Sequence, residues 1–346
     1  MIHHQKASDT YIMKQKKIVV IGGGTGTYTV LVGLKKYPVE LSAVVSMMDS
    51  GGSNRVIRDE FGFLPTSDIR QCMVALASDE TDELFRKLFT YRYEAGTGIS
   101  GMTFGNLFMA ALTDIYGSQE EALNKTCELL DVKGKIIPVT FDNTHLVARY
   151  SNGQQVLGEH YIDEPSEDNA KHKIVELEVF PKALANPKAT HEIEKADLIV
   201  LGPGDLYTSV LSNIVIEGIV DALRKTKAKK VLVVNLMTRH GQTDGFTARD
   251  HLREVEKYTG RGSIDICIVN KSKNYPKGVL ARYHEEDAYP VKDNLGNEGK
   301  VKIVRGDFIP KVVYEKPTSD RLIRSLIRHD PDKLAKAIVG ILDIRY

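Results

Sequence analysis

Cysteine is scarce in this chain of 346 residues, where it occurs three times, at Cys72, Cys127 and Cys267. The three positions lie far apart, so they form neither a CxxC pair nor an even set for disulfides. This pattern predicts a reducing, cytoplasmic environment in which the thiols pack as small apolar side chains.

A large excess of one charge is also absent. Lysine and arginine total 47, aspartate and glutamate total 46, and the formal net charge is +1. This balance gives no overall attraction to nucleic acid or to an anionic membrane, so any anion site has to be local. The ten histidines form no HExxH motif, and no apolar run is long enough to span a bilayer.

Short β-branched runs alternate with helical patterns along most of the chain, which is typical of a parallel sheet covered by helices. Asn152-Gly153 is a strong hairpin signal and predicts an antiparallel excursion near residues 140–180. We therefore expect an α/β fold, a three-layer α/β/α sandwich with a mainly parallel sheet. It would form one domain over residues 17–346, after a flexible extension over residues 1–16. Strands are expected at 17–21, 41–47, 145–150, 154–161, 174–180, 197–201, 230–236 and 264–270.

The first expected strand is followed by a glycine-rich turn, Gly22-Gly23-Gly24-Thr25-Gly26-Thr27, and then by a helical pattern. A turn with so few side chains lets backbone N–H groups approach a phosphate, and the helix N-terminus behind it favours negative charge. The turn lacks the third glycine of the dinucleotide fingerprint, because Thr27 stands in its place. A tight turn without a ligand would have the same composition, so both interpretations stay open.

Four more loops are rich in Gly, Ser, Thr, Asp and Asn. Because the carboxyl ends of parallel strands meet at one edge of a sheet, we expect these loops to converge there. Their backbone donors, hydroxyls and carboxylates suit a phosphorylated, hydroxyl-rich ligand, although ordinary turns use the same residues. The loops cover residues 46–70, 100–106, 202–209 and 237–245.

Asp49 ends the second expected strand, where it is either a ligand for a sugar hydroxyl or a metal, or a cap for the turn at Gly51-Gly52. Arg70 is a candidate phosphate clamp. Asp205 could bind a sugar or a metal, or cap the next helix, while Thr208 and Ser209 offer hydroxyls at the start of that helix.

Six of these segments, in this order, resemble the CofD/YvcK family: IGGGTG, DSGGS, LPTSDIRQCMVAL, GNLFMAAL, LGPGDLYTSV and NLMTRHGQTDG. The resemblance is greatest to the YvcK branch, the gluconeogenesis factors. It implies a Rossmann-like fold and a cytoplasmic, often dimeric protein that binds UDP-sugars, notably UDP-N-acetylglucosamine. Such proteins support growth and cell shape on gluconeogenic carbon sources. The more distant CofD branch transfers 2-phospholactate to a deazaflavin, with Mg²⁺ and a guanine nucleotide as leaving group.

Loops and resemblance together predict a binding surface for a nucleoside diphosphate derivative, with Asp49 as a metal ligand. If the protein is a transferase, Asp49 and Arg70 are the candidate catalytic residues. The predicted nucleotide- and phosphate-binding residues are Gly22, Gly23, Gly24, Thr25, Gly26, Thr27, Gly51, Gly52, Ser53, Asp68, Arg70, Asn106, Gly202, Gly204, Asp205, Tyr207, Thr208, Ser209, Asn235 and Thr238.

The chain departs from the family pattern at Ser50, where the family usually has a second acid. A Mg²⁺ site that needs two carboxylates would lose one ligand, which argues against transferase chemistry. The leading hypothesis is therefore a homodimeric, nucleotide-sugar-binding regulator that binds no nucleic acid. The alternatives are a Mg²⁺-dependent phospholactate-type transferase and, third, an NAD(P)-dependent oxidoreductase.

Overall fold

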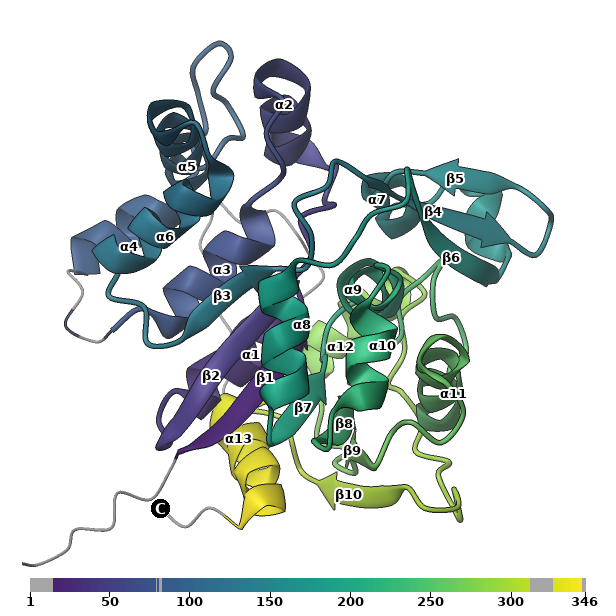
Figure 1. Cartoon of the computed structure of the whole chain (residues 1–346). Coiled ribbons are helices and arrows are strands. Elements are labelled where there is room, and N and C mark those ends of the chain that lie inside the picture. Colours follow the sequence, from purple (N-terminus) through teal and green to yellow (C-terminus); the bar gives the residue numbers. More distant parts are fainter. Residues whose placement is uncertain (1–14, 79, 81–82, 312–325, 344–346) are drawn as a thin grey trace, which may run out of the picture.

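The computed structural model describes residues 15–78, 80, 83–311 and 326–343, except for the side chains of Ser53 and Lys277. Residues 1–14 of the expected N-terminal extension lie outside the described part. Within it, the chain forms a seven-stranded sheet, a three-stranded sheet and flanking helices (Figure 1).

The seven-stranded sheet is parallel throughout and has the strand order β10-β9-β8-β7-β1-β2-β3. The chain extends from β1 to β2 on one side and returns to pair β7 with β1 on the other, so the strand order reverses beside β1. In open α/β sheets, ligands bind outside the carboxyl ends of the strands at such a point. The strands are β1 Lys16–Gly22, β2 Val39–Val45, β3 Lys135–Pro138, β7 Leu198–Leu201, β8 Lys229–Val233, β9 Ile266–Asn270 and β10 Lys302–Gly306.

Helices cover both faces of this sheet. Alternate side chains of β1 point to opposite faces: Val19 and Ile21 join one apolar core, whereas Ile18 and Val20 join the other. Helices α8, α10 and α11 pack on the Val19 face, and α1, α3 and α13 pack on the Ile18 face. The predicted three-layer α/β/α architecture is confirmed. These helices are α1 Gly24–Leu34, α3 Ser67–Leu76, α8 Pro187–Lys195, α10 Ile219–Lys225, α11 Ala248–Thr259 and α13 Pro331–Val339.

The antiparallel excursion is also confirmed. Strands β4 (His145–Tyr150), β5 (Gln155–Leu157) and β6 (Ile174–Phe180) form a sheet in the order β5-β4-β6. The expected second hairpin strand ends early, because Gly158 has a φ of +106° and turns the chain into helix α7, Glu159–Asp163. This short helix brings an otherwise unpredicted segment to the edge of the large sheet.

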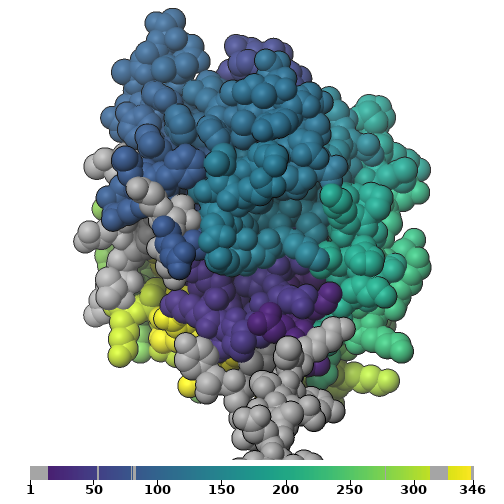
Figure 2. Space-filling model, turned by 60° about the vertical axis from the view of Figure 1, so that its left-hand side comes forward, coloured from purple at the N-terminus to yellow at the C-terminus, as the bar shows by residue number. Residues whose placement is uncertain are grey.

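Four helices gather beyond the β3 edge of the large sheet. Figure 2 shows much of this group as the blue and teal segments above the purple N-terminal strands. Ser118 followed by Glu121 is a capping-box pattern and predicts a helix start here; Ser118 does cap α6, since its side chain accepts a hydrogen bond from the backbone N of Glu121. The four helices are α2 Gly52–Phe61, α4 Glu83–Thr90, α5 Phe104–Tyr116 and α6 Gln119–Leu129.

Several elements differ from the sequence-based expectations. Helix α2 lies in a segment expected to be a loop; it is mostly polar, and Asn54 and Ile57 are the buried side chains among those described. The pattern over residues 212–225 predicts one helix, but the structure divides it, because Gly218 adopts a φ of +100° before α10. Strands β3 and β10 were not expected. The remaining elements are the π-helix η2 Leu206–Leu211, α9 Ser212–Ile214, α12 Lys277–Glu285, and the 3₁₀ helices η1 Asn169–Lys171 and η3 Gly340–Leu342.

Candidate functional site

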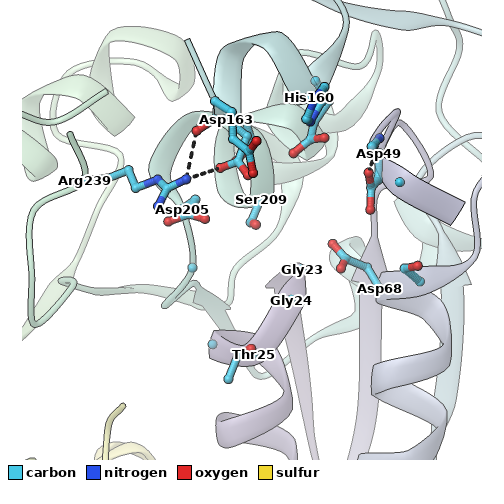
Figure 3. A pocket seen from close by; sticks show the side chains of 18 of the residues that line it. Gly23, Gly24, Thr25, Asp49, Asp68, His160, Asp163, Asp205, Ser209 and Arg239 are labelled. Atoms are coloured by element: carbon cyan, nitrogen blue, oxygen red, sulfur yellow. Dashed lines mark hydrogen bonds and ion pairs between the residues drawn. The ribbon is translucent and has the colours of Figure 1, made fainter. Parts of the chain in front are cut away.

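A cavity of about 1260 Å³ lies where the parallel strands β1, β2, β7 and β8 end. It is lined by Gly23 after β1, Asp49 after β2, Gly204 after β7 and Asn235 after β8. The predicted convergence of these loops is therefore seen in the structure. Figure 3 shows Gly23, Gly24 and Thr25 at the start of α1, between Asp49 and Asp68 on one side and Asp205 and Arg239 on the other.

The first wall of the cavity is made of two glycine-containing loops. An ideal Cβ on Gly26 would lie 2.1 Å from the carbonyl oxygen of Pro203 and 2.8 Å from the backbone nitrogen of Gly204. These distances are far below van der Waals contact, so the two loops pack this closely because position 26 is glycine. Gly24 has a φ of +60°, which glycine adopts without strain.

The 202–209 loop completes this wall. Asn235 donates from Nδ2 to the carbonyl oxygen of Gly204 at 2.8 Å, which ties the loop after β7 to the loop after β8. Thr208 and Ser209 line the cavity from the first residues of η2. Tyr207 lies between Leu206 and Thr208 but points into the apolar core, where it is fully buried.

The second wall carries several carboxyl groups, and the residues Asp49, Asp68 and Glu159 are half-buried. Asp49 Oδ1 accepts from the backbone N of Gly51 at 2.8 Å, and Oδ2 accepts from Asn54 Nδ2 at 2.5 Å. The pKa of Asp49 is raised, chiefly by burial, and that of Glu159 is raised well above its usual range by burial and by the charge of Asp49. Partial burial weakens the hydration of each charged form, so the neutral form of each carboxyl is favoured.

Asp68 lies against the glycine turn. An ideal Cβ on Gly23 would lie 2.1 Å from Asp68 Oδ2, and the backbone of Gly24 forms a hydrogen bond with the Asp68 carboxyl. Burial, and then the charge of Asp49, raise the pKa of Asp68 to about 7. This carboxyl therefore uses one backbone donor, that of Gly24, at the helix N-terminus where a phosphate would be expected to bind.

Arg70 is a buried cation behind Asp68. Burial lowers the pKa of Arg70 to about 10, while the charge of Asp68 acts in the opposite direction. Its Nε donates to Asn106 Oδ1 at 3.2 Å, and Asn106 Nδ2 donates to Asn54 Oδ1 at 3.2 Å. Asn106 does not line the cavity; it links Arg70 to the residue that holds Asp49.

Two acidic residues of this wall, Glu159 and Asp163, were not predicted from sequence. They come from α7, which is tied to the loops after β2 and β8. Ser50 Oγ accepts from the backbone N of His160 at 3.0 Å. At the other end of α7, the backbone oxygen of Asp163 accepts from Arg239 Nη2 at 2.8 Å (Figure 3). In the sequence, Glu159 and Asp163 could have been identified only from their spacing of four residues directly after the hairpin, which is a weak signal for a binding site.

A third wall is apolar and was also not predicted. It consists of Leu236 and Met237 after β8, Tyr283 of α12, Ala288 and Ile327, all of which are buried and line the cavity. The backbone N of Ile327 donates to the Tyr283 hydroxyl at 3.1 Å, so the C-terminal segment is fastened to α12.

Among the described residues, no group of three or more His, Cys, Asp or Glu is arranged to hold a metal ion. In addition, both oxygens of Asp49 accept hydrogen bonds from the protein. The role of Asp49 as a metal ligand stays a prediction. Ser50 stands where the family usually has a second acid, but Glu159 brings a second carboxyl next to Asp49 from a distant part of the chain.

The cavity brings together most of the predicted site residues, and their role in binding stays a prediction. Five lie outside its lining: Gly22, Thr27, Asn106, Gly202 and Tyr207. The side chain of Ser53, at the start of α2, lies outside the described part of the structure. The predicted residues that line the cavity are Gly23, Gly24, Thr25, Gly26, Asp49, Gly51, Gly52, Asp68, Arg70, Gly204, Asp205, Thr208, Ser209, Asn235 and Thr238.

Comparison with known proteins finds one matching family model and relatives that are similar to this chain over almost its whole length. The model of a family described as 2-phospho-L-lactate transferase CofD matches residues 18–309. A protein from Aquifex aeolicus named "Putative gluconeogenesis factor" is 40% identical over 96% of this chain and 98% of its own. The "Gluconeogenesis factor" of Bacillus subtilis is 34% identical over 95% and 99%. A crystal structure of a UPF0052 family member from Bacillus halodurans is similar with a TM-score of 0.84 and 34% identity, over 94% of this chain and 99% of that one.

Proposed function

The chain belongs to the CofD/YvcK family, and we propose that it is a nucleotide-sugar-binding regulatory protein linked to gluconeogenic carbon metabolism and cell shape. The proposed ligand is a UDP-sugar such as UDP-N-acetylglucosamine. In this proposal the protein acts in the cytoplasm as a homodimer. The observation that carries the proposal is the meeting of the glycine-rich N-terminus of α1 with several carboxyl groups in one large cavity.

The two polar walls suit the two polar parts of such a ligand. A diphosphate would lie at the N-terminus of α1, where backbone N–H groups and the hydroxyls of Thr25 and Ser209 are available as donors. Sugar hydroxyls would donate to the carboxyl oxygens of Glu159 and Asp163 on the opposite wall. A volume of about 1260 Å³ is large enough for a nucleotide sugar.

A phospholactate-type transferase is the second candidate, and Glu159 is the observation that favours it. Because Glu159 interacts with Asp49, the site has two neighbouring carboxyl groups despite Ser50. Asp49 and Glu159 would hold Mg²⁺, which would stabilise phosphate charge when bound. In this role Asp49 would position the acceptor hydroxyl, and Arg70 would support the phosphate-binding side of the cavity.

A thermal unfolding experiment tests the proposal. We expect UDP-N-acetylglucosamine to raise the melting temperature, since a ligand at a hundredfold excess over its Kd stabilises the folded state by about 2.7 kcal/mol. NAD and NADP should give no shift. The same samples, examined by NMR after incubation, should contain the nucleotide sugar unchanged. A shift with NAD alone would contradict the proposal, and turnover in the presence of Mg²⁺ and an acceptor would favour the transferase.

A further inference from the structure

The cavity has a part that the proposed nucleotide sugar does not use. Arg70 and Gln71 of α3 line it, together with Arg92, Tyr93 and Met102 from the 91–103 segment, which joins α4 to α5. The whole cavity measures about 1260 Å³, whereas sites for one drug-sized ligand measure about 300–1,000 Å³. A second, smaller ligand would therefore fit in the same cavity.

Arg70 is a buried cation without an anion. The residue is 7% exposed, and although burial lowers the pKa of its guanidinium group to about 10, the group stays charged at physiological pH. Its Nε donates to Asn106 Oδ1 at 3.2 Å. Within the described residues, neither Nη atom of Arg70 has a hydrogen-bond partner and no carboxylate forms an ion pair with it, yet both Nη atoms keep accessible surface. Buried charges are normally paired, so the missing partner is an anion that enters through the cavity.

The fold makes room for the Arg70 side chain. An ideal Cβ on Gly105 of α5 would lie 2.5 Å from Arg70 Cδ, so any side chain at position 105 would displace the arginine. Asp68, two residues earlier on α3, instead lies against the glycine turn, since its Oδ2 would be 2.1 Å from a Cβ on Gly23. Residues two apart on a helix do not share a face. Arg70 thus extends along α5, in a different direction from the α1 N-terminus.

A second arginine lies near this one. Arg92 lines the cavity, and its charge contributes to the lowered pKa of Arg70. Arg92 Nη1 donates to the backbone oxygen of Gly101 at 2.5 Å, but within the described structure Arg92 also lacks an ion pair. Two neighbouring cations repel each other, and an anion bound to both relieves the repulsion. Guanidinium groups match the oxygens of phosphate in geometry as well as in charge.

We infer that Arg70 and Arg92 form a binding site for the phosphate group of a small phosphomonoester, separate from the proposed diphosphate site at the α1 N-terminus. Such a group carries a charge of about −1.5 to −2 at pH 7 and three strong acceptor oxygens, enough to offset both cations. A monocarboxylate offsets only one of them. The inference goes beyond the proposed function and does not depend on it: the protein would respond to a phosphorylated metabolite as well as to a nucleotide sugar.

Calorimetric titration of the full chain with inorganic phosphate tests this inference. The protein is first saturated with UDP-N-acetylglucosamine, so that the α1 N-terminus is occupied and any phosphate that binds has to use another site. Phosphate should bind to this complex without displacing the nucleotide sugar. Acetate, a monoanion, should bind at least about tenfold more weakly.

Two variants locate the phosphate site. Arg92→Gln removes one cation from a partly exposed position, and we expect phosphate affinity to fall by about tenfold to hundredfold, because hydrogen bonds to charged groups contribute more than neutral ones. Arg92→Lys keeps the charge but loses the planar fork, so its affinity should fall by less than about tenfold. Melting temperatures of the free variants report whether each is folded.

Arg55→Gln is the matched control. Arg55 lies on α2, its Nε is 3.6 Å from Asp59 Oδ2, and it does not line the cavity. The substitution removes the same charge, and phosphate affinity should stay within about twofold of wild type.

Three results would overturn the inference while leaving nucleotide-sugar binding intact: phosphate that competes with UDP-N-acetylglucosamine, phosphate that binds no better than acetate, or a folded Arg92→Gln protein with wild-type phosphate affinity. If UDP-N-acetylglucosamine itself does not bind, the proposed function fails. Titration of the free wild-type, Arg92→Gln and Arg55→Gln proteins with phosphate would then still decide the inference.

Discussion

The glycine wall and the acidic wall of the cavity are built in different ways. A Cβ on Gly26 would collide with the backbone of Pro203 and Gly204, so the fit of the glycine wall against the 202–209 loop depends on the absence of a side chain at this position. The acidic wall places Asp49, Asp68 and Glu159 close together: the charge of Asp49 raises the pKa of Asp68, and the charges of Asp49 and Asp68 raise the pKa of Glu159. The glycine wall thus depends on close backbone packing. The acidic wall, in contrast, contains repulsion between carboxylates, which a bound ligand or a proton can relieve.

Gly26→Ala should produce the largest effect, because it disrupts the glycine wall. Its methyl group would collide with the backbone of Pro203 and Gly204, which cannot move aside as a flexible side chain can. We expect the free energy of unfolding in urea to fall by about 4 kcal/mol or more, and the thermal shift with UDP-N-acetylglucosamine to disappear. Gly24→Ala should be milder, since its Cβ would meet only Ser209 Oγ, at 3.8 Å, and the strain comes from φ alone.

Gly278→Ala is the control for this substitution. Gly278 lies in α12, has no neighbouring atom within 4 Å of an ideal Cβ, and does not have a positive φ. Its unfolding free energy should stay within about 1 kcal/mol of wild type. A Gly26→Ala protein with wild-type stability and ligand response would show that the two loops are not rigidly packed.

Asp68→Asn should produce the second largest effect, with the opposite sign, because it relieves repulsion in the acidic wall. The pKa of Asp68 is about 7 in the folded protein and about 3.9 in an unfolded chain. Between these values the folded state holds a proton that the unfolded state has released, so the unfolding free energy of wild type falls as the pH rises from about 4 to about 7. The neutral amide removes this dependence.

Urea unfolding across this pH range measures the effect. Near pH 8 the variant should be more stable than wild type by up to about 4 kcal/mol, and the difference should vanish near pH 4, which serves as the internal control. A difference that does not vary with pH would mean that Asp68 is ionised in the folded protein. The hydrogen bond between the Gly24 backbone and the Asp68 carboxyl would then be that of a permanent helix cap.

The same contrast explains what sequence reasoning could predict. Contiguous signals were sufficient for five of the seven parallel strands, for the hairpin at Asn152-Gly153 and for the glycine turn, because each depends on neighbours in the chain. Strand β10 was missed because Lys302–Gly306 is only partly buried and has no strong apolar run. Helix α2 was missed for a similar reason, since its polar residues cover little of the core.

The acidic wall could be predicted only in part. Asp49 and Asp68 follow or begin elements of the βα pattern, so the sheet topology indicates where they lie. Glu159 and Asp163 reach the cavity through hydrogen bonds between distant segments, such as Ser50 Oγ with His160 N and Arg239 with Asp163. Ser50 looked like the loss of a carboxylate; in the structure it anchors the helix that supplies another one. No local pattern encodes that exchange.

Removal of divalent metal should produce the smallest effect, and it tests what neutralises the acidic wall. The oxygens of Asp49 accept from Gly51 and Asn54, and Asp163 Oδ1 accepts from Arg239 and Gln242, so protein donors already stabilise these carboxyl groups. The raised pKa values of Asp49 and Glu159 favour protonation, which also removes charge without a metal. We expect EDTA to change the Kd for UDP-N-acetylglucosamine by less than about twofold, or about 0.4 kcal/mol.

Ser50→Asp sharpens this last test, because it adds the acid that the family pattern usually has at this position. The new carboxylate would lie near Glu159 and Asp49, and adjacent carboxylates are the oxygen ligands that Mg²⁺ prefers. Binding by this variant should therefore depend on Mg²⁺. Ser50→Ala is the control: it removes the acceptor for His160 N and adds no charge, so its binding should be insensitive to EDTA. If wild-type binding were lost in EDTA, Asp49 and Glu159 would be acting as metal ligands, and the transferase would become the better description of the site.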